Sequence, residues 1–75
     1  MTQDEAKNLR AMKYRYVKIV WRNPEYDWPY FRLLEVDAED DTIKLRRIDN
    51  AEREVDEFWT YWRDVKSIEP VQINT

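Results

Sequence analysis

The chain has 75 residues, of which 43% are hydrophobic and 39% charged, and its formal net charge is −3. It contains no Gly, Cys or His, which excludes disulfides and Ser-His catalysis and removes the residues on which most phosphate-binding loops and metal sites depend. A chain of this length forms a single domain, residues 1–75, and buries only about 60% of its unfolded surface.

The start of the sequence and its apolar runs predict a cytoplasmic protein. Residues 1–5 (MTQDE) are acidic where a secretory signal is basic. The longest apolar run, residues 19–21, is far too short to cross a bilayer, so no membrane partner is expected. The absence of cysteine fits a reducing compartment.

The first segment, residues 3–12, is predicted to be a short helix. Thr2 and Glu5 have the spacing of a capping box, in which each satisfies a backbone amide of the first helical turn. Ala6, Leu9 and Met12 recur every third residue and form a narrow apolar stripe. Such a helix is expected to dock on a larger structure, because it is too short to be stable alone.

From Tyr14 onward the hydrophobic pattern becomes extended, with Val17, Ile19 and Trp21 on one strand face. Residues 23–29 contain two prolines and are predicted to form an extended loop. The predicted strands are residues 14–22, 30–38, 42–48, 54–63 and 68–73, with a one-turn connector at 64–67. Without glycine, the turn positions that need positive φ fall to the Asp40-Asp41 and Asp49-Asn50 pairs.

Five short strands with a long first loop and tight later hairpins predict a mainly β fold, a small five-stranded antiparallel barrel with an N-terminal helix. Residues 42–48 (TIKLRRI) and 64–71 (DVKSIEPV) resemble the third strand and the final turn and strand of SH3-like and Sm-like barrels. The leading helix is similar to the Sm-like arrangement. The chain lacks an ALYDY-like segment, a late Pro-x-x-Tyr and the strand-bending glycine of Sm proteins, so the resemblance implies a fold and no ligand.

Aromatic residues are the strongest functional signal, because eleven of them occur in this short chain. Residues 58–62 (FWTYW) place aromatic side chains on both faces of one strand, and only one face can point inward. Trp21, Phe31, Phe58 and Trp62 are expected to fill the interior. The second face is covered by the helix or the loop, or it belongs to an exposed groove, or it forms a homodimer contact.

The leading hypothesis is a non-catalytic binding or regulatory module that engages a protein or peptide. Trp and Tyr suit this role because they bury large, rigid areas at low entropic cost. Glu25 and Asp27 would help to orient the partner through their charge. The candidate partner-binding residues are Tyr26, Trp28, Tyr30, Trp59 and Tyr61.

The alternative hypothesis is a small barrel that binds single-stranded RNA or DNA. Basic and aromatic residues interleave in residues 13–18, and more basic residues lie on the third predicted strand. The simpler interpretation is a solvated strand face paired with carboxylates, because residues 35–75 hold twelve Asp and Glu against six Lys and Arg. The candidate nucleic-acid residues are Lys13, Arg15, Lys18, Lys44, Arg46 and Arg47.

The sequence offers little support for metal binding, a cofactor or catalysis. Asp37, Glu39 and Asp41 alternate as calcium ligands sometimes do, but the loop lacks the required glycine and the distal Glu. Ser67, the only serine, has no histidine to activate it. Residues 54–57 supply carboxylates without the spacing of an acid-base pair, so no enzyme activity is expected.

Overall fold

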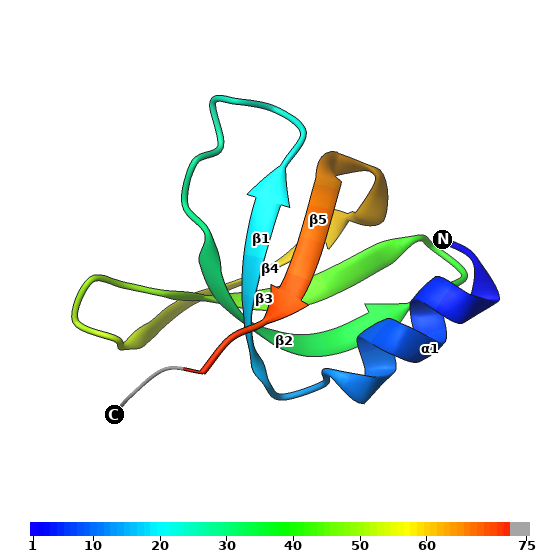
Figure 1. The fold of residues 1–75 in the computed structure, drawn as a ribbon, viewed down its shortest axis with the longest axis horizontal. Coiled ribbons are helices and arrows are strands. Elements are labelled where there is room, and N and C mark those ends of the chain that lie inside the picture. Colours follow the sequence, from blue (N-terminus) through cyan, green and yellow to red (C-terminus); the bar gives the residue numbers. More distant parts are fainter. Residues whose placement is uncertain (73–75) are drawn as a thin grey trace.

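The computed structural model describes residues 1–72, which form one α-helix, five strands and one short helical turn. Figure 1 shows the helix beside one end of a strongly bent antiparallel sheet. The elements are α1 (Gln3–Ala11), β1 (Tyr16–Trp21), β2 (Tyr30–Asp37), β3 (Thr42–Ile48), β4 (Glu54–Tyr61), the 3₁₀ turn η1 (Trp62–Asp64) and β5 (Val65–Pro70).

Helix α1 begins with the predicted capping box. The Thr2 hydroxyl accepts from the Glu5 amide at 3.1 Å, and the Glu5 carboxylate accepts from the Thr2 amide at 2.8 Å. The bond from the Thr2 amide, followed by the bond from the Trp62 indole, holds the pKa of Glu5 below its usual range. Ala6 and Leu9 are buried, and Met12 packs against the core, which confirms the predicted apolar stripe.

The first four strands follow the predicted pattern closely. Val17 and Ile19 on β1 are fully buried, and β3 has the predicted bounds. The end of the chain differs, since β4 stops at Tyr61, the connector is residues 62–64, and β5 begins at Val65. Val65 is a core residue paired with Trp21 of β1, so burial pulls it into the strand although its neighbours suggest a turn. The predicted end of the fifth strand, Ile73, lies outside the described residues.

The five antiparallel strands and the N-terminal helix are confirmed, but the sheet is open and does not close into the predicted barrel. Its strand order is β4-β3-β2-β1-β5, so β4 and β5 are edge strands that follow one another in the chain without pairing as a ladder. Figure 1 shows the β3–β4 hairpin extending beyond the rest of the sheet, away from β5. The first half of β4, residues 54–57, has no buried residue and carries three carboxylates, so no apolar face draws it towards β5.

Of the two turns predicted to hold a residue of positive φ in an Asp or Asn pair, one is confirmed. Asp41 has a φ of 59° in the turn between β2 and β3. In the next turn Glu52 takes the left-handed conformation with a φ of 62°, while Asp49 accepts backbone bonds from Ala51 and Arg53. The bond from Arg53 is the main reason that the pKa of Asp49 lies below its ordinary value. Tyr14 adopts a third positive φ, 68°, just after α1.

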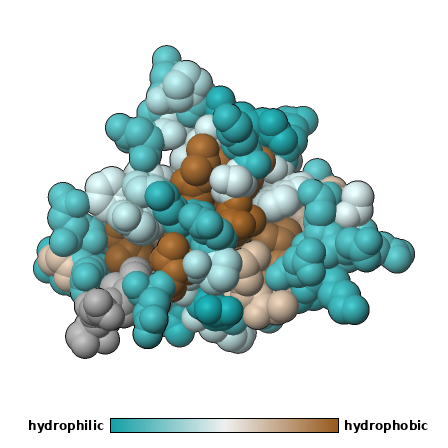
Figure 2. Space-filling model, in the orientation of Figure 1, coloured by the Kyte–Doolittle hydropathy of each residue, from teal (hydrophilic) through white to brown (hydrophobic). Residues whose placement is uncertain are grey.

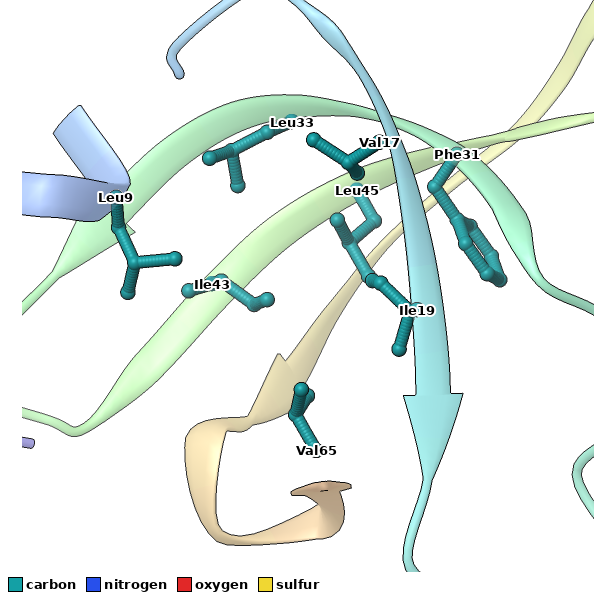
Figure 3. Packing of buried hydrophobic residues seen from close by; sticks show 8 residues of the cluster. All are labelled: Leu9, Val17, Ile19, Phe31, Leu33, Ile43, Leu45 and Val65. Carbon is teal, nitrogen blue, oxygen red and sulfur yellow. The ribbon is translucent and has the colours of Figure 1, made fainter. Parts of the chain in front are cut away.

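The buried core is almost entirely aliphatic. Figure 3 shows its eight central residues, which come from α1, β1, β2, β3 and β5: Leu9, Val17, Ile19, Phe31, Leu33, Ile43, Leu45 and Val65. Of the four aromatic residues expected to fill the interior, Phe31 is buried. Trp21, Phe58 and Trp62 are half-buried and pack against the core from outside. Most of the aromatic surface is therefore left for the boundary and exterior of the fold.

Figure 2 shows an apolar region on the surface, in the middle of one face over β1 and β5, ringed by hydrophilic residues. Val20 on β1 is exposed and Ile68 on β5 is half-buried, and they lie on opposite faces of the sheet, because Ile68 pairs with the buried Ile19 and Val20 pairs with Ser67. Within the described part of the chain, no helix is long and apolar enough to cross a membrane.

Candidate functional site

Six of the eleven aromatic residues meet at one groove of about 430 Å³. The groove lies between the long loop that joins β1 to β2, residues 22–29, and the second half of β4. Its aromatic lining consists of Trp21, Tyr26, Trp28, Phe31, Phe58 and Trp59. We call this the aromatic groove; its volume is in the range of sites that enclose a few ligand side chains.

A continuous row of ring contacts forms the floor of the aromatic groove. Tyr26 lies 6.0 Å from Trp21, measured between ring centroids. Trp21 meets Phe31 edge-on at 5.5 Å, and Phe31 meets Phe58 in the same way at 5.8 Å. These are the distances and tilts that aromatic pairs prefer, so the row links the loop to β4 through the edge of the core.

Two tryptophan hydrogen bonds hold the loop in place over the sheet. The Trp21 indole N–H donates to the Trp28 carbonyl at 2.9 Å. The Trp28 indole N–H donates to the Ile48 carbonyl at 2.8 Å, at the end of β3. Since Pro24 and Pro29 also restrict the backbone of this loop, the groove wall is preorganised.

Carboxylates dominate the charged groups that line the aromatic groove. Glu25, Asp27 and Asp64 line it, and all three are exposed. Arg47 also lines it, and its guanidinium donates to Asp56 through Nε at 3.1 Å and Nη2 at 2.9 Å. The groove therefore combines aromatic walls with a negative rim.

The five predicted partner-binding residues do not all lie together. Tyr26, Trp28 and Trp59 line the aromatic groove. Tyr26 and Trp59 are 64% and 51% exposed, whereas Trp28 is half-buried and packs against the core. Tyr30 lines a neighbouring hollow with Lys18 and Glu69. Tyr61 lines another hollow with Asp37 and Thr42, and Trp59 lines this hollow as well as the groove.

Several groove residues were not predicted as part of a binding site. Trp21, Phe31 and Phe58 were assigned to the interior, because strand alternation places them on the core side. Phe31 is buried, whereas Trp21 and Phe58 are half-buried, and the open edge of the sheet leaves part of these two rings accessible to the groove. Asp64 reaches the groove through η1, and no sequence signal marks it as a neighbour of the loop.

The basic residues of the nucleic-acid hypothesis are mostly engaged by carboxylates. Lys13 pairs with Glu35 at 3.3 Å, and Arg47 pairs with Asp56. The hydrogen bond that Lys13 donates to Glu35 is the main reason that the pKa of Lys13 is raised. Within residues 1–72, neither Arg15 nor Lys18 takes part in an ion pair, so the six candidates do not present one common set of free cations.

A network of alternating basic and acidic side chains crosses the outer face of β2, β3 and β4. Glu54 accepts from Arg32 and Arg46, both at 3.2 Å, and Glu57 accepts from Arg46 at 2.7 Å and pairs with Lys44 at 3.6 Å. The bond to Glu57, ahead of the bond to Glu54, raises the pKa of Arg46. The same Arg46 bond keeps the pKa of Glu57 below its usual range. This face is internally neutralised and partly screened by water.

Among the described residues, cations of the chain also lie over four rings, of which only Trp59 lines the groove. Lys13 lies 5.1 Å from the Tyr14 ring centroid, and Arg63 lies 4.6 Å from that of Tyr61. The other two pairs of this kind are Arg32 with Tyr16 at 5.6 Å and Lys44 with Trp59 at 5.9 Å. These contacts place a cation of the chain beside each of these rings, although Tyr14, Trp59 and Tyr61 stay exposed.

Among residues 1–72, no group of three His, Cys, Asp or Glu side chains gathers as a metal site. No protein-family model matches the chain, and comparisons with curated proteins and with solved structures give no match either.

Proposed function

We propose that this protein is a non-catalytic binding or regulatory module that holds a segment of a protein or peptide partner in the aromatic groove. One observation carries the proposal. The core is filled by aliphatic side chains, while six aromatic residues gather around a single groove. Trp21, Trp28, Phe31 and Phe58 belong to the core or pack against it, but core burial does not account for the exposed Tyr26 and Trp59. Recognition would use them, because rigid aromatic anchors supply most of the binding energy at many interfaces.

In the proposed mechanism, the partner displaces water from Tyr26 and Trp59, the most exposed groove aromatics. The loop pays little entropy on binding, since the bonds of Trp21 and Trp28 already fix it. The charged rim then orients the partner as it approaches.

We also propose that the open sheet is a variant of the SH3-like or Sm-like architecture. The long first loop, the tight later hairpins and the single helical turn before β5 support this relation. The helix that precedes β1 supports the Sm-like variant. The relation concerns the fold and does not assign a ligand.

The proposal is tested by selecting short random peptides on the immobilised protein and measuring the affinity of the selected peptides for variants. Tyr26→Ala is expected to weaken binding by about tenfold, because a large exposed anchor is lost. Tyr61→Ala is the matched control, since Tyr61 is 52% exposed but lies outside the groove. Its effect is expected to stay below about twofold.

Two results would contradict this assignment. One is a selection that yields no peptide with measurable affinity for the wild-type protein. The other is a set of peptides whose binding responds equally to Tyr26→Ala and Tyr61→Ala. Circular dichroism of each variant establishes that it is folded. Trp28→Ala is a poor test, because Trp28 also holds the loop to β3.

A further inference from the structure

The acidic residues that line the aromatic groove are available to a partner. Glu25, Asp27 and Asp64 are exposed, and none of them takes part in an ion pair within residues 1–72. By contrast, Glu54 and Glu57 on the outer face of β4 are held by Arg and Lys side chains of the chain itself. A positively charged group can therefore approach the groove without displacing an internal cation.

The aromatic rings show a parallel difference between the groove and the outer face. The four cation-ring contacts of the described residues involve Tyr14, Tyr16, Trp59 and Tyr61. Among the rings that line the groove, only Trp59 belongs to this set. Trp21, Tyr26 and Trp28 thus present ring surface to the groove with no cation of the described chain above it. The negative face of such a ring attracts a cation, most strongly when water is excluded.

The single basic residue among the described groove residues does not offset this negative charge. Arg47 donates two hydrogen bonds to Asp56, which lies outside the groove lining. A partner carboxylate would meet three carboxylates and one guanidinium that is already occupied. The groove therefore disfavours acidic segments as well as favouring basic ones, and both effects add to specificity.

Resting on the proposed function, we infer that the groove recognises a basic peptide segment, in which a Lys or Arg side chain is flanked by apolar residues. The aliphatic stem of that side chain packs along the rings of Trp21 and Tyr26. Its charged end reaches the carboxylates of the rim, and the flanking apolar residues contact the remaining aromatic surface. Two observations support this inference: the groove is lined by carboxylates without an ion pair, and by aromatic rings without a cation of the described chain above them.

The test begins with the sequences of the peptides selected on the wild-type protein. They are expected to be enriched in Lys or Arg relative to the unselected library. The tightest selected peptide is then synthesised with its basic residue and with norleucine in its place. Norleucine keeps the aliphatic stem and removes the charge, so its affinity is expected to fall by about tenfold.

A charge-matched pair of protein variants locates the effect. The triple variant Glu25→Gln, Asp27→Asn, Asp64→Asn removes the carboxylates that line the groove and is expected to weaken binding by about tenfold. The control Glu39→Gln, Asp40→Asn, Glu69→Gln changes the net charge equally at exposed residues outside the groove. At physiological salt its effect is expected to stay below about twofold, because charges beyond a Debye length of about 8 Å are screened.

The outcomes separate this inference from the function on which it rests. Peptides that need Tyr26 but show no basic enrichment would overturn the inference and leave the binding function standing. Equal effects of the two triple variants would also overturn it. The absence of any groove-dependent peptide contradicts the binding function itself. Sedimentation of the protein alone tests whether a second copy of the chain occupies the groove. A dimer that dissociates in the Tyr26→Ala variant would assign the groove to that second copy and overturn the inference.

Discussion

At the scale of single residues, the half-buried tryptophans matter most, because each serves both the fold and the groove. Trp28 packs against the core, lines the aromatic groove and lies edge-on to Tyr30 at 6.5 Å. Its indole donates to the carbonyl of Ile48, the last residue of β3, which pairs with Glu54 of β4. Trp59 differs, since it is exposed and no hydrogen bond of its indole is found among residues 1–72.

Trp28→Phe is expected to lower the free energy of unfolding by about 1 to 2 kcal/mol. The phenyl ring retains most of the apolar contact but cannot donate to the Ile48 carbonyl. Trp59→Phe is the control and is expected to change stability by less than about 0.5 kcal/mol. Urea unfolding followed by circular dichroism measures both. Equal effects would show that the Trp28 bond does not anchor the loop.

At the scale of elements, α1 depends on the sheet for its stability. A nine-residue helix is marginal in water even with a good cap. Its buried residues Ala6 and Leu9 lie against the sheet, and the Trp62 indole donates to Glu5 at 3.1 Å from the other end of the chain. The helix thus closes one end of the core, while the aromatic groove lies at the Phe31 end (Figure 3).

Leu9→Ala is expected to cost about 2 to 5 kcal/mol of stability, because it removes a fully buried side chain and leaves a cavity beside Ile43 and Leu33. That is a large share of the total for a chain of this size. Lys7→Ala, on the exposed side of the same helix, is expected to be close to neutral. Chemical denaturation compares the two variants. A small effect of Leu9→Ala would mean that α1 is not part of the cooperative core.

At the scale of the whole molecule, folding pairs charges that the sequence keeps apart. Residues 1–34 carry seven Lys and Arg against four Asp and Glu, and the rest of the chain has the opposite balance. Lys13 reaches Glu35, and Arg32 reaches Glu54, so basic residues of the first half are matched by carboxylates of the second. Among the described residues, the charged side chains that line the aromatic groove without an ion-pair partner are all carboxylates.

A fluorescent single-stranded oligothymidylate is therefore not expected to bind at about 50 mM salt, where phosphate contacts are strong. Four of the six candidate cations already bind carboxylates, and the net charge of −3 repels a polyanion. Fluorescence anisotropy measures the titration. Binding that falls steeply with added salt and is lost in Arg15→Ala or Lys18→Ala would favour the nucleic-acid hypothesis instead.

Much of the fold followed from local patterns. The capping box of Thr2 and Glu5, the alternation of Val17 and Ile19, and the bounds of β3 are set by interactions within a few residues, which sequence reasoning captures. The start of β5 did not follow from them. Val65 joins the strand because β1 offers it a partner and the core offers it burial, and both depend on contacts distant in sequence.

The sequence by itself determined that the protein is a small, mainly β domain with more aromatic residues than its core requires. The tertiary structure decided which of them form a site. Strand alternation assigns a residue to a face, but it does not reveal where a sheet ends. Because β4 and β5 do not pair with each other, Trp21 and Phe58 stay partly accessible beside the buried Phe31. All three meet Tyr26 and Asp64 only in the folded chain.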